Sequence, residues 1–93
     1  LRMVPHNWGT AIRTPSELHW MAITPAVSEG LRAPPVTFEF DQTESPFRDI
    51  VIRQRIEPSS EDGLLAVPDG PGLGIDIVPE AIREYRTRLI EIR

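Results

Sequence analysis

The residues of this sequence best suited to acid–base chemistry are a histidine and a glutamate, His6 and Glu39. His6 lies at the end of a short extended run, since Pro5 keeps the residue before it out of the helical region. Glu39 lies near the end of segment 36–40, in which apolar and polar residues alternate as in a strand. If the two strands are parallel, both side chains lie at one edge of a sheet. There they could act as base and acid on opposite faces of a carbon acid.

Taken separately, His6 and Glu39 would each more often be a hydrogen-bonding residue than a catalyst, so the prediction of a site rests on their pairing. Trp8 could line the same pocket, although burial alone would also explain a tryptophan there. His19 falls inside a predicted helix, where packing or surface exposure is the more ordinary role. Glu44, in the loop after the second strand, is a weaker candidate for the acid.

A helix with marked ends is predicted between the two strands, over residues 15–24. Thr14 fits its N-cap, Pro15 its first position and Glu17 its third, which together form a capping box. A helix that began earlier would include the proline, at the cost of a backbone hydrogen bond and a steric clash. Pro25 ends the helix. Strand, helix and strand in this order have the length of a parallel crossover, which is normally right-handed.

The second half of the sequence is predicted to consist of short strands followed by one helix. The three strands are at residues 50–56, 64–67 and 75–78. In the first of them Ile50 and Ile52 share one face, and Val51 lies on the opposite face with two arginines. The helix begins at Pro79 and has apolar residues at core spacing as far as Leu89.

The glycine-rich segment 68–74 lies between the last two predicted strands. Gly70, Gly72 and Gly74 fall short of the dinucleotide-binding fingerprint, which needs its third glycine three residues after the second, at the start of a helix. Pro71 also lacks an N–H that could bind phosphate. We therefore predict a turn between strands and no phosphate site here.

Composition excludes several classes of site and partner. The 93 residues contain no cysteine, so disulfides and zinc–thiolate sites are excluded. No segment approaches the roughly 20 apolar residues of a membrane helix, and no membrane partner is expected. The ten basic residues are all arginine, against fourteen acidic residues, which gives a net charge of -4. This balance argues against a nucleic-acid partner, and the lack of lysine excludes Schiff-base chemistry.

Three stretches of the sequence, residues 4–10, 38–41 and 67–75, together resemble the C-terminal part of the mandelate racemase and muconate-lactonizing enzyme family, within the enolase superfamily. The resemblance runs across nearly the whole chain. Its most specific stretch is Pro-Asp-Gly-Pro-Gly-Leu-Gly, and Pro-His-x-Trp-Gly-Thr looks most like the acid-sugar dehydratase branch.

The resemblance implies an α/β fold, namely the C-terminal fragment of a modified (β/α)8 (TIM) barrel that has a separate capping domain. Residues 1–48 would be the last βαβ portion of the barrel. Residues 49–93 would return to pack on the barrel and on the capping domain, within a single, incomplete structural unit. Active sites of such barrels lie at the C-terminal ends of the strands, which is where His6 and Glu39 fall.

The resemblance also implies a reaction, in which Mg²⁺ holds a substrate carboxylate while the α-proton is removed to give an enediolate. His6 matches a histidine that is a base in racemases and can be an acid in dehydratases, and Glu39 matches a glutamate that donates to the carboxylate. The expected substrate is an acid sugar, with dehydration first and racemisation or epimerisation next. The expected location is cytoplasmic.

No residue of this chain matches the metal-binding carboxylates of that family, so the chain by itself is expected to be inactive. Its expected partners are the remainder of the enzyme chain or further copies of itself. The alternative is a non-enzymatic module derived from that fold, which associates with itself or a partner through strand edges and apolar faces left uncovered. A small acidic regulator is supported by the charge alone.

Overall fold

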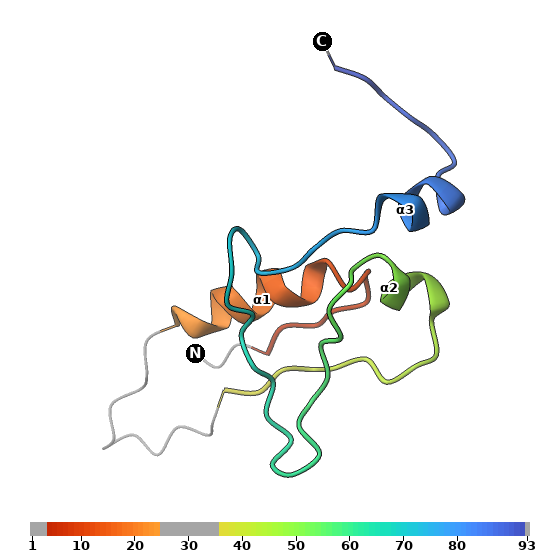
Figure 1. The fold of residues 1–93 in the computed structure, drawn as a ribbon. Coiled ribbons are helices and arrows are strands. Elements are labelled where there is room, and N and C mark those ends of the chain that lie inside the picture. The colour runs from red at the N-terminus through yellow and green to blue at the C-terminus, as the bar shows by residue number, and fades with distance from the viewer. Residues whose placement is uncertain (1–3, 25–35, 93) are drawn as a thin grey trace.

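The computed structural model describes residues 4–24 and 36–92. Three helices, α1 (Arg13–Ala22), α2 (Pro46–Ile50) and α3 (Pro79–Tyr85), are connected by extended segments and turns (Figure 1). Two isolated β-bridges join these segments in the described residues, a parallel one between His6 and Glu39 and an antiparallel one between Ile52 and Ile77. Residues 1–3 of the first predicted strand, together with Pro25, lie outside the described residues.

Helix α1 begins earlier than predicted, and its predicted N-cap at Thr14 is wrong. The N-cap is Ile12, which makes no side-chain capping bond, and Thr14 is the buried second residue of the helix. Pro15 is tolerated as the third residue because the first four N–H groups of a helix have no intrahelical acceptor. Glu17 does not close a capping box, and instead its Oε1 accepts a hydrogen bond from Arg13 Nε at 2.7 Å.

The parallel pairing predicted for the first two strands is present at one position. The Glu39 amide donates to the Pro5 carbonyl at 3.4 Å, and α1 connects the two segments (Figure 1). Around this bridge, residues 36–40 form no longer strand. The barrel fragment implied by the resemblance therefore stays a prediction, and its division between residues 48 and 49 falls inside α2.

The strand predicted over 50–56 is wrong at its start, because α2 includes Ile50. Val51 follows as the helix C-cap with helical backbone angles, φ −77° and ψ −13°. The alternation of side chains between two faces of a strand does not apply to a residue with helical backbone angles. Val51 is therefore buried, at 1% exposure, although the predicted strand places it on the polar face. Residues 64–67, predicted as a strand, form no β-bridge with another segment. Residues 75–78 form one, between Ile77 and Ile52.

The glycine-rich segment forms the predicted turn. Gly74 donates its amide to the Pro71 carbonyl at 3.1 Å and has a φ of +70°. A Cβ at Gly74 would lie 2.8 Å from Pro68 Cβ, so both the backbone angle and the space favour glycine. The turn contacts α1 through His19, whose Nε2 lies 3.3 Å from the Leu73 carbonyl oxygen. His19 therefore makes a half-buried contact between the helix and the turn.

The core of the described residues is small. Its buried apolar side chains are Leu18, Val51, Ile52 and Ala81. Helices α2 and α3 lie side by side, and the rings of Phe47 and Tyr85 are 4.9 Å apart. Helix α3 begins at Pro79 as predicted but ends at Tyr85, so that the predicted core position Leu89 lies beyond it and is 60% exposed.

Much of the apolar surface is uncovered. Large apolar side chains that are more than half exposed are Trp8, Trp20, Ile23, Val36, Leu64, Leu89, Ile90 and Ile92. The radius of gyration is 15.8 Å, against roughly 13 Å for a compact domain of about 100 residues. The segment after α3 runs away from the rest of the molecule (Figure 1). Within the described residues, no helix has the length and apolar character that crossing a bilayer requires.

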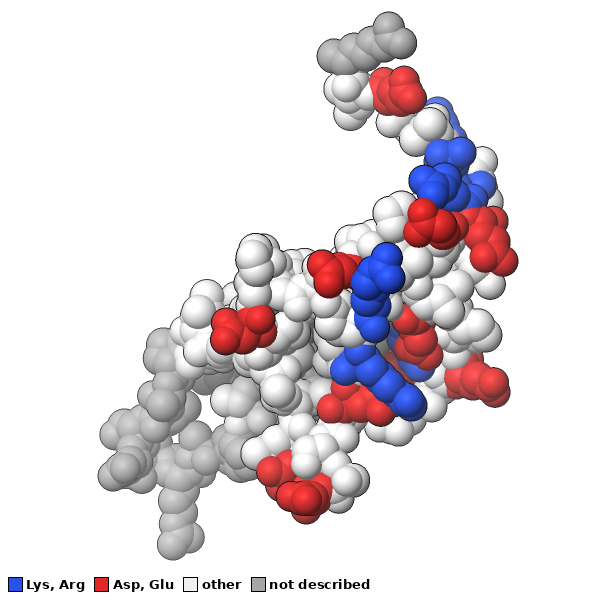
Figure 2. All heavy atoms as spheres, in the orientation of Figure 1, with Lys and Arg blue, Asp and Glu red and all other residues white. Residues whose placement is uncertain are grey.

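Arginine and carboxylate side chains lie next to one another on the face drawn in Figure 2. Among the described residues, Arg83 pairs with Glu80 and Arg55 with Glu57, each at 2.6 Å. Exposed pairs of this kind contribute about 0–1 kcal/mol each. They reduce the positive field of the arginines locally, and they do little to hold the fold together.

Candidate functional site

The structure brings the two predicted acid–base residues into direct contact. The parallel bridge joins His6 to Glu39, and His6 Nδ1 lies 3.0 Å from Glu39 Oε2. Both side chains are open to solvent, at 65% and 61% exposure. The arrangement differs from the predicted one, in which base and acid flank the substrate, because a 3.0 Å contact leaves no room for a carbon atom between them. A ligand would have to lie beside the pair.

The contact favours one of the two ring nitrogens of His6 as the proton acceptor. A carboxylate oxygen only accepts hydrogen bonds, so a proton on Nδ1 is the arrangement that this 3.0 Å ion-pair contact favours. In the neutral imidazole Nε2 is then the acceptor. The pair can therefore present a base at Nε2 whose orientation is set by Glu39.

Trp8 lies at the rim of the same site. It is 80% exposed, so burial does not explain its position, and its ring centroid is 6.4 Å from that of His6. A cavity of about 330 Å³ is lined by His6, Asn7, Trp8, Glu39, Phe40, Asp41 and Gln42. This volume is in the range of small-molecule sites. Glu44, the weaker candidate for the acid, is not among the lining residues.

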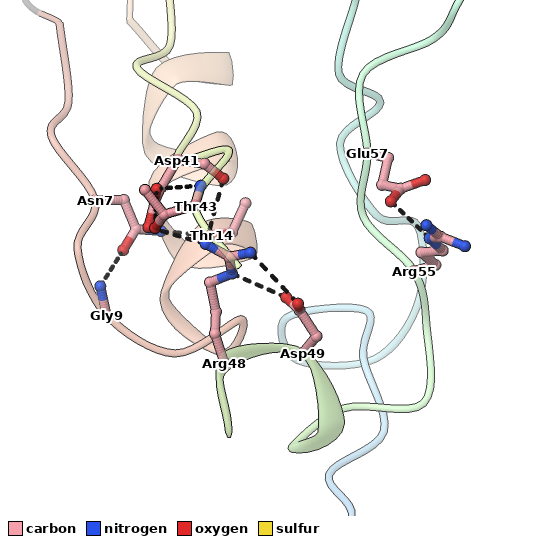
Figure 3. A network of polar contacts seen from close by, with 9 residues as sticks. All are labelled: Asn7, Gly9, Thr14, Asp41, Thr43, Arg48, Asp49, Arg55 and Glu57. Carbon is pink, nitrogen blue, oxygen red and sulfur yellow. Dashed lines mark hydrogen bonds and ion pairs between the residues drawn. The ribbon is translucent and has the colours of Figure 1, made fainter. Parts of the chain in front are cut away.

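Asn7 fixes the loop that follows His6, and its role was not anticipated from the sequence. Its side chain is buried, and Nδ2 donates to the hydroxyl of Thr14 at 2.8 Å (Figure 3). Its Oδ1 accepts from the amide of Gly9 at 3.0 Å. The spacing Asn-x-Gly is the available signal for such a turn, in which asparagine binds the backbone two residues on.

Asp41 fixes the segment that follows Glu39 in a similar way. Its Oδ1 accepts from the amide of Thr43 at 2.8 Å and from the Thr43 hydroxyl at 2.6 Å. Arg48 adds a hydrogen bond from Nη1 to Asp41 Oδ2 at 2.9 Å. The two bonds from Thr43, with a smaller contribution from Arg48, hold the pKa of Asp41 below its ordinary value of 3.8. The sequence signal is again a spacing, Asp-x-Thr.

Arg48 lies between two carboxylates. Its Nε donates to Asp49 Oδ1 at 2.9 Å, and its Nη1 donates to Asp41. Hydrogen bonding to Asp49 first, and then the charges of both carboxylates, raise the pKa of Arg48 further above its already high value. The guanidinium therefore stays charged, and Figure 3 shows it bonded to the carboxylates of Asp41 and Asp49.

A second cavity of about 410 Å³ adjoins the first. Four residues line both cavities, namely Asn7, Phe40, Asp41 and Gln42. Arg48 lines the second cavity only. The wall between the two cavities is thus made by the segments that follow His6 and Glu39.

The described residues do not fit a magnesium site. Mg²⁺ needs a near-octahedral shell of oxygen ligands, some of them protein carboxylates. In the ranges 4–24 and 36–92, no group of three or more His, Cys, Asp or Glu side chains is placed to hold a metal ion.

No known protein-family profile matches the chain. It is 42% identical over 89 residues to D-galactarolactone cycloisomerase of Agrobacterium fabrum (strain C58 / ATCC 33970). The match covers 92% of this chain and 22% of that enzyme, so the chain spans about a fifth of the length of the curated relative it matches. The similarity supports a distant relationship between this chain and one part of an enolase-superfamily, isomerase-type enzyme.

Proposed function

We propose that this chain contributes the His6–Glu39 pair to the active site of an enolase-superfamily enzyme that acts on a small acid-sugar carboxylate. The reaction would begin with removal of the proton α to the carboxylate. The observation that supports this most directly is the 3.0 Å contact between His6 Nδ1 and Glu39 Oε2 at the edge of a cavity. The similarity to a cycloisomerase favours an isomerisation over the dehydration suggested by the resemblance of residues 5–10.

In this proposal His6 is the group that moves the proton. Its Nδ1 faces Glu39, so Nε2 is the atom that takes the α-proton or returns it to the product. Glu39 keeps the imidazole in this tautomer and orientation, which is the part a carboxylate plays in hydrolytic triads. Because both side chains are more than half exposed, a substrate can reach either of them.

Glu39 also has a second role in this proposal. When a substrate carboxylate enters beside the pair, a protonated Glu39 would donate a hydrogen bond to the oxygen on which negative charge develops. This role and the orientation of His6 belong to different protonation states of Glu39, because only the ionised carboxylate accepts from Nδ1. Trp8 would form the apolar edge of the pocket, since its ring is exposed next to His6. Magnesium, when bound by other parts of a longer protein, would stabilise negative charge on the substrate carboxylate.

The test follows exchange of the α-proton for deuterium by ¹H NMR, with acid-sugar dicarboxylates in D₂O and Mg²⁺ present. The protein is used in whatever complex it is purified in, identified first by native mass spectrometry. His6→Asn should lower the exchange rate by about 10²–10⁴-fold, the usual contribution of a general base. His19→Asn is the matched control, because His19 contacts the Leu73 carbonyl outside the cavity. Equal rates in the two variants would rule out His6 as the base.

The alternative of a non-enzymatic association module has one specific observation in its favour. Trp20 near the end of α1 and Ile23 just after the helix are exposed, and so are Ile90 and Ile92 in the segment after α3. Patches of this kind mark interaction surfaces when they are contiguous. Native mass spectrometry separates the two proposals. A chain that travels only with its own copies and is unaffected by Mg²⁺ supports the module and contradicts the enzymatic role. A chain that travels alone and is unaffected by Mg²⁺ contradicts both.

A further inference from the structure

We propose that Arg48 is a positioning residue that holds the His6-bearing and Glu39-bearing segments in register. Its relevance to catalysis rests on the function proposed above, whereas the contacts themselves do not. Arg48 lies nine residues after Glu39 and 42 residues after His6, and it binds the segment that follows each of them. Its side chain binds the segment after Glu39, and its backbone binds the segment after His6.

The side chain of Arg48 binds the segment that follows Glu39. Nη1 donates to Asp41 Oδ2 at 2.9 Å and to the Asp41 carbonyl at 3.3 Å, two residues after Glu39. The side chains of Arg48 and Asp41 are each 18% exposed, so water competes little for this contact. Asp49 accepts from Nε and Nη2 on the other edge of the guanidinium, which leaves it little rotational freedom (Figure 3).

The backbone of Arg48 binds the segment that follows His6. Its carbonyl oxygen accepts from the amide of Ala11 at 3.0 Å, five residues after His6 and just before α1. That segment is also bonded to α1, because the buried Asn7 donates a hydrogen bond to Thr14 in the helix. One residue of α2 therefore connects both sides of the site.

The His6–Glu39 pair needs such a support because its own contacts are weak. Ion pairs that are open to water contribute little to stability, and both of these side chains are more than 60% exposed. The backbone bond at this bridge, from the Glu39 amide to the Pro5 carbonyl, is long at 3.4 Å. The distance between base and carboxylate is therefore set by the elements behind them, and Arg48 is the residue that joins those elements.

The test is amide hydrogen exchange followed by NMR, which needs no turnover. The reporter is the Glu39 amide, which donates to Pro5, and the internal reference is the Arg53 amide, which donates to Asp76 in the other bridge. Arg48→Gln should speed exchange at Glu39 by about tenfold, the effect of losing one charge-assisted bond. Exchange at Arg53 should stay within about twofold of the wild-type rate.

Three further variants complete the design. Arg48→Lys keeps the charge and should restore part of the Glu39 protection, whereas Asp41→Asn should reproduce the loss from the other side of the contact. Arg55→Gln is the matched control, because Arg55 forms an exposed pair with Glu57 and should leave Glu39 unchanged. Faster exchange at Glu39 and Arg53 alike, or unchanged exchange at Glu39 in both Arg48→Gln and Asp41→Asn, would overturn the proposal. Failure of the α-proton exchange assay would not alter these rates, so the two proposals fail separately.

Discussion

The two bridges found among the described residues differ in the polarity and exposure of their side chains. At the antiparallel bridge Ile52 is 5% exposed and its neighbour Val51 is 1% exposed. Two backbone bonds of 2.9 Å flank it, from Arg53 to Asp76 and from Val78 to Val51. At the parallel bridge, His6 and Glu39 are polar and exposed, and the backbone bond is 3.4 Å long.

The difference suits the antiparallel bridge to stabilising the fold and the parallel bridge to chemistry. Apolar burial is the dominant favourable term in folding, and two of the four buried apolar side chains of the described core, Val51 and Ile52, lie at or beside the antiparallel bridge. A proton-transfer site needs accessible polar atoms, and these are at the parallel bridge. The residues that hold the parallel bridge in place are therefore polar ones behind it, namely Asn7, Asp41 and Arg48.

The largest effect is expected at the antiparallel bridge. Ile52→Ala removes buried methyl groups and should lower the free energy of unfolding by about 2–5 kcal/mol, measured by urea denaturation. Ile52→Val, at about 0.5–1.5 kcal/mol, keeps the measurement possible if the alanine variant does not fold. Ile92→Ala is the control, since Ile92 is 94% exposed and its loss should change stability by less than about 0.5 kcal/mol. Equal losses for Ile52 and Ile92 would mean that this bridge is not the core.

A smaller effect is expected behind the parallel bridge. Thr14→Val keeps the shape of the side chain but leaves Asn7 Nδ2 buried without its acceptor, at a cost of about 1–3 kcal/mol. Thr24→Val is the matched control, because the Thr24 hydroxyl bonds to the Trp20 carbonyl in an exposed position. Urea denaturation should show a clear loss for Thr14 alone. A loss for Thr24 as large as that for Thr14 would argue against a special role of the Asn7 contact.

The sequence predicts the features that depend on local signals. The prolines place the start of α3 and the glycines place the turn over 68–74, because each restricts or frees the backbone at its own position. The meeting of His6 and Glu39 was also predictable, since a helix between two short extended runs favours a parallel pairing.

The features that the sequence did not reveal depend on distant partners. Thr14 has the residue type of an N-cap, but its hydroxyl is bonded to Asn7 instead, seven residues earlier. Helix α2 has only five residues, too few to show a helical period, and without it the burial of Val51 could not be foreseen. In the sequence nothing distinguishes Arg48 from a surface arginine, because its ion pairs with Asp41 and Asp49 are visible only in the structure.

The smallest effect is a pH dependence at Asp41. Its pKa is lower in the folded chain than its ordinary value of 3.8, because the carboxylate accepts bonds from Thr43 and faces Arg48. A carboxyl group with a lowered folded pKa stabilises the fold fully above its unfolded pKa, and this contribution disappears as the pH falls through the folded value. Stability measured by urea denaturation should therefore decline more between pH 5 and pH 3 in the wild type than in Asp41→Asn.

Asp62 provides the control for this measurement, because its pKa is also lowered, by the Leu64 amide first and then by Ser59. Asp62→Asn should likewise reduce the pH dependence of stability, but it should leave exchange at the Glu39 amide unchanged. Asp41→Asn should alter both, since Asp41 lies two residues after Glu39 and is bonded to Arg48. If Asp62→Asn changed the exchange rate of the Glu39 amide as strongly as Asp41→Asn, a general loss of stability would explain both results. The parallel bridge would then have no polar support of its own.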